Sequence, residues 1–311
     1  MQNPNEIKKR IKSVDDIGQM TRAMQLVSAS KMRRSRALHD TVYPFFSLCA
    51  ESMLEILHGD YTIDNPYCNL VQKKEGTWKI AYFVLSGEQG LAGVYNNEVV
   101  KSTEDHIRSK ILDNTGKGLS TDYTLYVFGN IAREKLKKDG YNVDPEFSYL
   151  ISEPTFFQAR EVSSIIKEKF LINHYDLVYL IYTKMESAIN MKPIIIRLVP
   201  IDKKSIMAVL PENIGDPGVA LEQGSEMEYS PDASTVFNFL IDTYLNAMVY
   251  GAMVEAYSSE QTARMTAMDN ASKNADEMIK KLELMSNRAR QSKITNELTE
   301  IINGAEQANN I

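Results

Sequence analysis

Residues 232–303 form one uninterrupted helical pattern, with apolar residues at steps of three and four from Met265 onward, and this predicts one very long helix. The run contains no proline and a single glycine, Gly251. As one helix it would be roughly 105 Å long, at about 1.5 Å per residue, which is several times what a compact domain requires. A long shaft is therefore the first interpretation of this stretch, and a helix of a compact domain is the second.

A narrow apolar stripe follows the second half of this predicted helix. Its steps of three and four residues are close to the period of 3.5 that keeps one seam against a partner helix. The stripe consists of Met265, Met268, Ala271, Ala275, Ile279 (or Met278), Leu282, Met285 and Ala289. The other faces are polar, so the segment has too little apolar surface to be buried all round. An ordinary amphipathic helix would explain the stripe but not the length.

A second long helical pattern covers residues 5–57. Its apolar residues also fall at steps of three and four and form a second seam: Ile7, Ile11, Val14, Ile17, Met20, Met24 and Val27. Gly18 should weaken this helix slightly, and Pro44 should kink it because proline lacks a backbone donor and clashes with the preceding turn. Turn residues replace the periodicity at residues 59–76, which predicts a linker.

Short apolar runs alternate with helical segments between the two long helices. We expect strands at residues 78–85, 123–128, 175–182 and 194–199, helices at 94–111, 130–138 and 155–170, and loops at 113–121 and 200–231. Strands that alternate with helices of this length predict a partly parallel sheet with helices against its faces.

The two seams lie at opposite ends of the chain, and the nearest available partner for each is the other. Because the chain leaves the first helix and enters the second beside the inserted domain, the pair must be antiparallel. The expected fold is α/β: a long antiparallel coiled coil of N- and C-terminal helices with an inserted Rossmann-like domain. The expected domains are residues 1–58, 77–200 and 231–304. Part of the longer C-terminal helix should extend beyond its partner or pack elsewhere.

Composition limits the function classes. The 311 residues are 43% hydrophobic and 24% charged, and no run reaches the roughly 18 to 20 apolar residues of a membrane span. The start resembles neither a secretory signal nor a transit peptide. Cys49 and Cys68 are too few for a disulfide framework, which fits a reducing compartment. The four histidines lack metal-ligand spacing, so we expect no metal site.

A glycine-bearing loop is the one candidate for nucleotide chemistry. Gly87, Gly90 and Gly93 follow a predicted strand and open a predicted helix, where a dinucleotide-binding turn would lie. The fingerprint requires glycine where Glu88 stands, and a carboxylate there would oppose a pyrophosphate. The chain has no phosphate loop of the form GxxxxGK[ST] and no evident activated nucleophile. We therefore expect no catalytic or cofactor-binding residues.

Basic residues gather in two clusters on the N-terminal helix. One cluster is Lys8, Lys9, Arg10 and Lys12, and the other is Lys31, Arg33, Arg34 and Arg36. Nucleic-acid binding is one interpretation, but the net charge of −6 and the lack of a recognised motif count against it. A solvated helix face and a docking surface for an acidic protein partner are the other interpretations.

Both ends of the chain resemble the gamma subunit of F-type ATP synthases. The N-terminal similarity lies in IKKRIKSVDDIGQMTRAMQLVSASKMRRSR (residues 7–36), and the C-terminal similarity lies in SEQTARMTAMDNASKNADEMIKKLELMSNRARQSKITNELTEIINGA (residues 259–305). Weaker similarity runs through the middle, for example in GLAGVYN (residues 90–96). The sequence departs from the family in its glycine loop, where Ala92 replaces the usual cysteine and Val94 a glycine.

The resemblance implies a noncatalytic central rotor shaft without a cofactor of its own. It would stand in a ring of three alpha and three beta subunits and couple ion translocation through the membrane c-ring to ATP synthesis or hydrolysis. The α/β domain would be a foot on the epsilon subunit and the c-ring. The complex would lie on the cytoplasmic face of a bacterial cell membrane, with this chain peripheral.

The resemblance also implies two sets of subunit-coupling contacts. Met24 and the basic residues Lys31, Arg33 and Arg34 match positions near an acidic loop of the beta subunits. The second set matches positions that catch polar groups of alpha and beta subunits: Arg264, Arg290, Gln291, Thr295 and Glu297. Two other functions stay open from the residues alone, namely a dinucleotide-binding enzyme built on the α/β domain and a basic coiled-coil module that binds nucleic acid.

Overall fold

Two long helices and a four-stranded sheet make up the chain. The computed structural model describes residues 4–58, 63, 65–68, 73–149, 153–185, 190–207 and 228–309. Helix α1 spans Pro4–His58 and helix α7 spans Ala233–Asn309. The chain divides into two compact units, which are described separately below. The shaft unit consists of Met1–Ala29 and Arg264–Ile311, and the foot unit consists of Ser30–Ala263.

The foot unit is built on a mixed sheet in the order β2-β1-β3-β4. Its strands are β1 (Thr77–Leu85), β2 (Ser120–Phe128), β3 (Leu177–Met185) and β4 (Met191–Val199). Strand β1 lies parallel to both β2 and β3, and β4 lies antiparallel to β3. The expectation of a partly parallel sheet is therefore confirmed.

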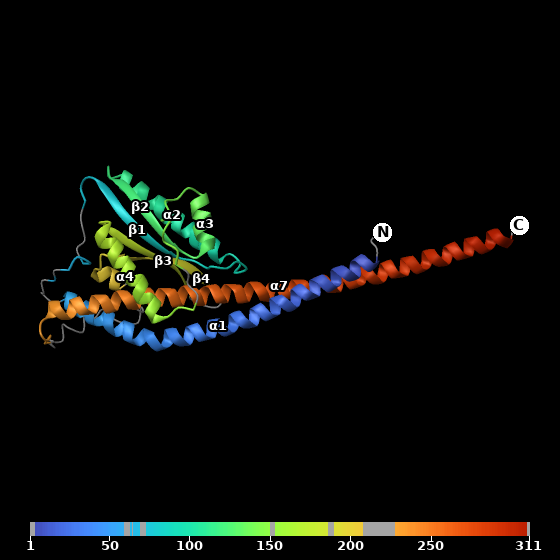
Figure 1. Cartoon of the computed structure of the whole chain (residues 1–311), viewed down its shortest axis with the longest axis horizontal. Coiled ribbons are helices and arrows are strands. Elements are labelled where there is room, and N and C mark those ends of the chain that lie inside the picture. The colour runs from blue at the N-terminus through green and yellow to red at the C-terminus, as the bar shows by residue number, and fades with distance from the viewer. Residues whose placement is uncertain are drawn as a thin grey trace. The chain divides into compact units, whose positions relative to one another are not determined.

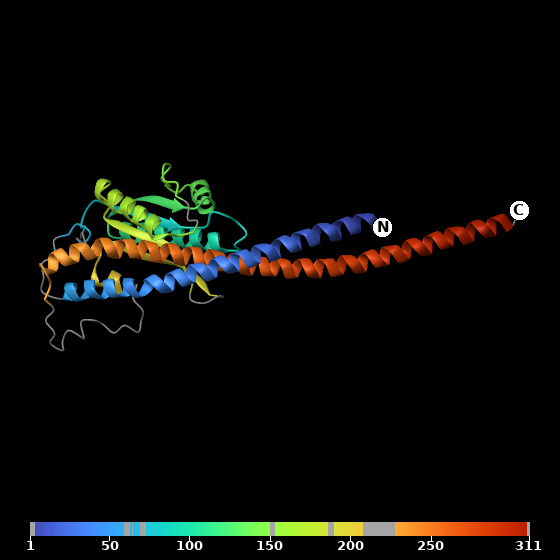
Figure 2. The same cartoon turned by 60° about the horizontal axis from the view of Figure 1, so that its bottom comes forward.

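Helices cover both faces of this sheet (Figures 1 and 2). They are α2 (Tyr95–Thr115), α3 (Asn130–Lys138), α4 (Phe156–Ile172) and the short α5 (Lys203–Met207). Thr155 caps α4: its side chain accepts a hydrogen bond from the Gln158 backbone, and the Gln158 side chain accepts one from the Thr155 backbone.

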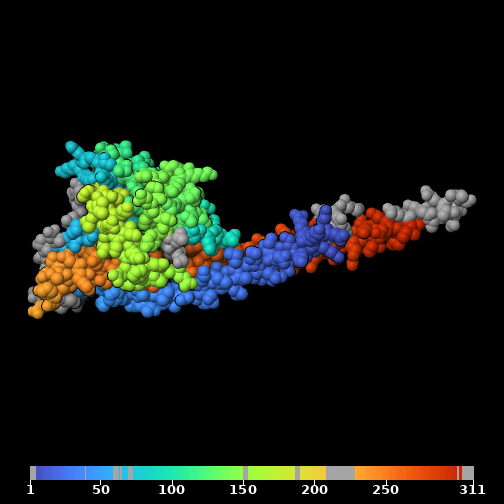
Figure 3. Space-filling view, viewed as in Figure 1, coloured from blue at the N-terminus to red at the C-terminus, as the bar shows by residue number. Residues whose placement is uncertain are grey.

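Alternate residues of the strands enter two separate cores. In β1, Ile80, Tyr82 and Val84 pack with residues of α2 and α3. On the other face, Phe83 and Leu85 pack with residues of α4, α1 and α7. Because both faces are covered, the strand reads as a continuous apolar run rather than an alternating one. Figure 3 shows α4 lying against the first part of α7, where Lys167 and Asp242 form an ion pair of 2.8 Å.

Within the foot unit α1 and α7 pack antiparallel. The Ser35 hydroxyl donates to the carbonyl oxygen of Val254 at 3.3 Å. Farther along, the rings of Phe46 and Tyr244 stack with centroids 5.9 Å apart. Partners advance along α1 as they recede along α7, which confirms the predicted antiparallel pairing.

The expected elements are present, and the ends of most of them are shifted. Helix α2 continues to Thr115 and β2 begins at Ser120, so the loop expected at residues 113–121 is shorter than predicted. The loop expected at residues 200–231 contains α5, and its residues 208–227 lie outside the described residues. Half of the linker expected at residues 59–76 lies outside them too. Helix α1 continues through Pro44.

Candidate functional site

The shaft unit is a tight helix pair whose contact face consists largely of small residues. Gly18 of α1 faces Ala275 of α7 so closely that a Cβ atom on Gly18 would lie 3.4 Å from the Ala275 Cβ. On α7 the residues Met268, Ala275 and Leu282 are buried at intervals of seven, as expected for one seam of a coiled coil. Met285 was predicted to belong to this seam but is 44% exposed.

The predicted seam of α1 is correct at its start and wrong farther on. Ile7 is buried, and Ile11 and Val14 are half-buried. Beyond them the buried positions are small or polar: Gly18, Thr21 and Ser28. Of the apolar residues predicted there, Met24 is half-buried and three are exposed: Ile17 at 54%, Met20 at 65% and Val27 at 55%. Small side chains let the helix backbones approach, and the larger apolar residues lie on a neighbouring face.

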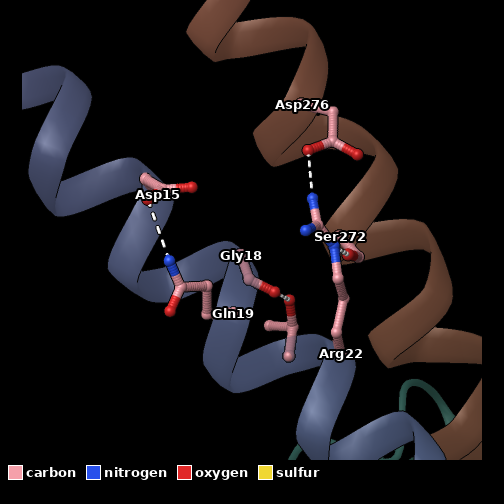
Figure 4. A network of polar contacts seen from close by, with 7 residues as sticks. Asp15, Gly18, Gln19, Arg22, Ser272 and Asp276 are labelled. Carbon is pink, nitrogen blue, oxygen red and sulfur yellow. Dashed lines mark hydrogen bonds and ion pairs between the residues drawn. The ribbon is translucent and has the colours of Figure 1, made fainter.

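Polar side chains connect the two helices of the shaft unit (Figure 4). The Arg22 guanidinium donates to the Ser272 hydroxyl at 3.1 Å and forms an ion pair with Asp276. About one turn farther along α1, the Gln25 side-chain amide donates to the Asp269 carboxylate at 3.0 Å. Asp269 also accepts a hydrogen bond from Lys273 at 2.6 Å, and this contact holds the pKa of the Asp269 carboxyl below its usual range. These directional contacts fix one register of the pair.

The end of α7 extends past its partner helix within the shaft unit (Figure 1). Gly18 lies opposite Ala275, so in an antiparallel pair Pro4, at the start of α1, lies opposite about residue 289 of α7. Later residues of α7 therefore have no neighbour from α1. An apolar stripe continues there and is exposed: Ile294 at 49%, Leu298 at 55%, Ile301 at 67% and Ile302 at 57%.

Four of the predicted coupling residues lie on this extension of α7. Arg290, Gln291, Thr295 and Glu297 are all exposed. The Thr295 hydroxyl donates to the carbonyl oxygen of Gln291 at 3.0 Å, and Glu297 lies 3.6 Å from Lys293. Surface contacts of this kind are weak and leave the side chains available for other partners.

The other predicted coupling residues differ in burial. In the shaft unit, Met24 is half-buried and Arg264 is only 5% exposed. In the foot unit, Lys31, Arg33 and Arg34 are exposed, and Arg34 lies 3.4 Å from Glu153, which precedes α4. The structure therefore assigns the predicted residues to both units rather than to one cluster.

The glycine-bearing loop after β1 contacts the start of α3 through Glu88. The Glu88 carboxylate accepts hydrogen bonds from the backbone N–H of Asn130, at 3.1 Å, and from the Asn130 side chain. It thus occupies the N-terminus of α3, where a phosphate would otherwise be favoured. Among the described residues no three acidic, His or Cys side chains are grouped so that they could hold a metal ion. In the same part of the chain no helix is long and apolar enough to cross a membrane.

Comparisons with known proteins agree with this architecture. A sequence model of the ATP synthase family matches residues 3–307. The ATP synthase gamma chain of Ruminiclostridium cellulolyticum is 41% identical over 303 residues, which are 97% of this chain and 98% of that one. The chain belongs to the ATP synthase gamma-chain family. A gamma chain of Acetobacterium woodii described as sodium ion specific is 34% identical over 316 residues, 99% of each chain.

Solved structures support the fold of this gamma chain. A chain in the cryo-EM structure of the Euglena gracilis mitochondrial ATP synthase, in its OSCP, F1 and c-ring assembly, matches with a TM-score of 0.62. The match covers 98% of this gamma chain and 94% of the other, at 17% sequence identity. The paired terminal helices with an inserted α/β domain are thus a shared architecture at low sequence identity.

Sequence reasoning missed the polar contacts between the helices of this gamma chain. Neither Arg22 nor Gln25 was singled out from the sequence, because the seam was traced through Ile17 and Met20. The heptad spacing of Ile7, Val14, Thr21 and Ser28 was a signal that could have found the true contact face. It was overlooked because two of these four residues are not apolar.

Proposed function

We propose that this chain, a gamma subunit of an F-type ATP synthase, turns as the central rotor shaft inside a ring of three alpha and three beta subunits. Rotation would couple ion translocation through a membrane c-ring to ATP synthesis or hydrolysis at sites that lie on the beta subunits. The chain itself would be noncatalytic. It would be a peripheral part of the membrane-bound complex, on its cytoplasmic face.

One observation carries the proposal: the end of α7 leaves its partner helix while keeping an exposed apolar stripe. Residues such as Ile294, Leu298 and Ile301 cost free energy in water, so a surrounding protein surface is expected to cover them. Polar residues of the same segment, including Arg290 and Glu297, are exposed and can pair with that surface.

The unequal faces of the helix pair supply a physical mechanism. In a near-threefold ring, each beta subunit would meet a different face at any moment, and rotation would exchange these faces. Moving a site from 1:99 to 99:1 between two conformations takes about 5.5 kcal/mol of differential contact energy. Two or three charge-assisted hydrogen bonds, at roughly 1.5 to 3 kcal/mol each, are of that size.

We assign two groups of residues to these contacts. Arg290, Gln291, Thr295 and Glu297 would pair with polar groups of alpha and beta subunits near the end of α7, together with Arg264. Arg264 is already buried in the isolated chain, so only a small part of its side chain would be accessible to a partner subunit. Met24, Lys31, Arg33 and Arg34 would face an acidic loop of the beta subunits.

The foot unit would bind the epsilon subunit and the c-ring. It keeps a doubly wound sheet, yet Glu88 closes the N-terminus of α3 to phosphate groups. Glu88 also stands where the dinucleotide fingerprint requires glycine, which disfavours the alternative of a dinucleotide-binding enzyme. The net charge of −6 likewise disfavours nucleic acid as a partner.

Reconstitution tests the proposed function. ATP hydrolysis by alpha and beta subunits would be measured with and without this chain, and with the Arg290→Ala variant. We expect the chain to stimulate hydrolysis and Arg290→Ala to weaken that stimulation. The matched control Lys281→Ala changes an exposed cation on the paired part of α7 and should have little effect. Hydrolysis that is undiminished without the chain would refute the proposal.

A further inference from the structure

The carboxyl edge of the sheet is where doubly wound folds usually bind ligands. In such folds the ligand-binding crevice opens at the point where the order of the strands in the sheet reverses. In the order β2-β1-β3 this point lies between β1 and β3, beyond Leu85 and Met185. In this chain residues 255–262 of α7, which belong to the same foot unit, contact both of these strand ends.

Three hydrogen bonds and one further polar contact connect this part of α7 to the edge of the sheet. The Ser259 hydroxyl donates to the carbonyl oxygen of Thr183 at 3.0 Å, and the Thr262 hydroxyl lies 3.4 Å from the Met185 sulfur. The backbone N–H of Met185 donates to the Glu255 carboxylate at 3.0 Å. From the first residue of α2, the Tyr95 hydroxyl donates to the carbonyl oxygen of Ala256 at 3.0 Å. The loop between β1 and α2 lies beside α7 in both views (Figures 1 and 2).

Gly87 brings the same loop into direct contact with a buried carboxylate of α7. A Cβ atom at Gly87 would lie 2.8 Å from both Cδ and Oε1 of Glu260, well inside van der Waals contact. The Gly87 backbone N–H donates to the side-chain oxygen of Asn96 at 2.8 Å, which holds the loop in place. By contrast, a Cβ at Gly90 would have its nearest neighbour, an Ile131 methyl, at 4.0 Å. A Cβ atom at Gly87 would therefore displace the end of the Glu260 side chain, whereas one at Gly90 would displace nothing.

The contact stretch of α7 is unusual because it is polar and yet buried. Its residues are 0% to 6% exposed: Ser258, Ser259, Glu260, Gln261 and Thr262. Burying polar groups costs free energy unless they are hydrogen-bonded, and apolar residues would fill the same space at lower cost. Hydrogen bonds, however, have preferred directions, so they resist sliding and rotation of the helix in a way that apolar packing does not.

We propose that these contacts form a clamp that fixes α7 against the foot so that torque passes from the foot into the shaft. The clamp consists of Gly87, Tyr95, Thr183 and Met185 on the foot side and Glu255, Ser259, Glu260 and Thr262 on α7. Glu260 is a positioning residue in this scheme, and Gly87 leaves the space for its carboxylate. The inference rests on the proposed rotor function and assigns the point where force enters the long helix.

A redox-controlled variant tests the clamp in the complete, membrane-reconstituted complex. Gly87→Cys combined with Glu260→Cys removes the carboxylate and places one thiol on each side of this contact, and oxidation is designed to join foot and helix covalently. The readouts are the rate of ATP hydrolysis and the number of ions transported per ATP. The parent protein, treated with the same oxidant, controls for Cys49 and Cys68, which are both free thiols.

The expected result is a loss of coupling in the reduced variant and its recovery on oxidation. Ions transported per ATP should fall several-fold while hydrolysis continues, and the disulfide should restore the parent value. Gly87→Ala should lower the ratio in the same direction, whereas the control Gly90→Ala should leave it unchanged. Parent coupling in the reduced variant, failure of the disulfide to form, or no recovery after it forms would overturn the clamp. Ion transport by a complex lacking this chain altogether would instead refute the rotor function.

Discussion

Replacing Arg22 by methionine is the sharpest test of how the shaft unit is held together. The variant removes an ion pair with Asp276, whose side chains are 49% and 48% exposed, so that contact is worth only about 0.5 kcal/mol. It also removes the hydrogen bond to Ser272, which is 6% exposed, and leaving that hydroxyl unpaired costs about 1 kcal/mol. We therefore expect a loss of about 1.5 kcal/mol in local stability.

Amide hydrogen exchange is the suitable assay because it reports the opening free energy of one region. Exchange along residues 264–282 of α7 should become about tenfold faster in Arg22→Met, which is the ratio expected from a loss of this size. Lys9→Met provides the control, since Lys9 is an exposed cation of the same helix and no ion pair of it is found among the described residues.

A double-mutant cycle separates the contact from other effects of the substitution. When Arg22→Met is made in a Ser272→Ala background, no buried hydroxyl is left unpaired, so the second loss should be smaller by about 1 kcal/mol. Strictly additive effects would show that the guanidinium and the hydroxyl do not interact. That result would refute the conclusion that polar contacts fix the register of the helix pair.

Three further predictions concern the foot unit and the middle of α7. Gly129→Ala should lower the free energy of unfolding in urea by more than about 1 kcal/mol. Gly129 has φ of 83°, and an added Cβ would lie 2.6 Å from the Ser86 carbonyl oxygen. An unchanged urea midpoint of unfolding would contradict this close approach. Gly251→Ala should stabilise the chain by about 1 kcal/mol in the same assay, because an added Cβ meets nothing within 4 Å and glycine is unfavourable inside a helix. Burial and the nearby Lys110 lower the pKa of His106 from 6.5 to about 4. Between these two values the unfolded chain binds a proton at His106 and the folded chain does not. The free energy of unfolding should therefore be highest above pH 6.5 and should fall as the pH drops toward 4. His106→Phe should flatten that pH dependence of urea unfolding, and an equally steep profile would exclude His106 as its cause.

The sequence predicted the architecture because the signals for it are long and repetitive. A stripe such as Met268, Ala275 and Leu282 repeats at a fixed interval, and an element of this length leaves few alternatives. Both ends of α3 were predicted to the residue. Its C-terminal end is marked by Gly140, which lies just after the helix and has φ of 84°, a backbone conformation that ends helices. The direction of β4 could not be predicted from periodicity, because an apolar run looks the same in either direction.

The contact face of α1 was mispredicted for a physical reason. Pattern reading assumes that the most apolar residues face the partner helix, yet Gly18 and Ser28 occupy the contact and Met20 and Val27 are exposed. Close approach of two backbones favours small side chains, which carry no hydropathy signal. The buried stretch around Glu260 escaped for the same reason, since polar residues in a helix read as solvated until the structure places a sheet edge against them.

Rotation of the chain itself is the most direct test of the central claim. A reporter particle attached to an exposed residue of the foot unit, such as Arg160 on α4, would be observed while immobilised alpha and beta subunits hydrolyse ATP. The account predicts that the particle turns in one direction, in the steps of a third of a turn that the proposed ring with three beta subunits would set, and stops when ATP is withdrawn. Steady ATP hydrolysis with a stationary foot would contradict it.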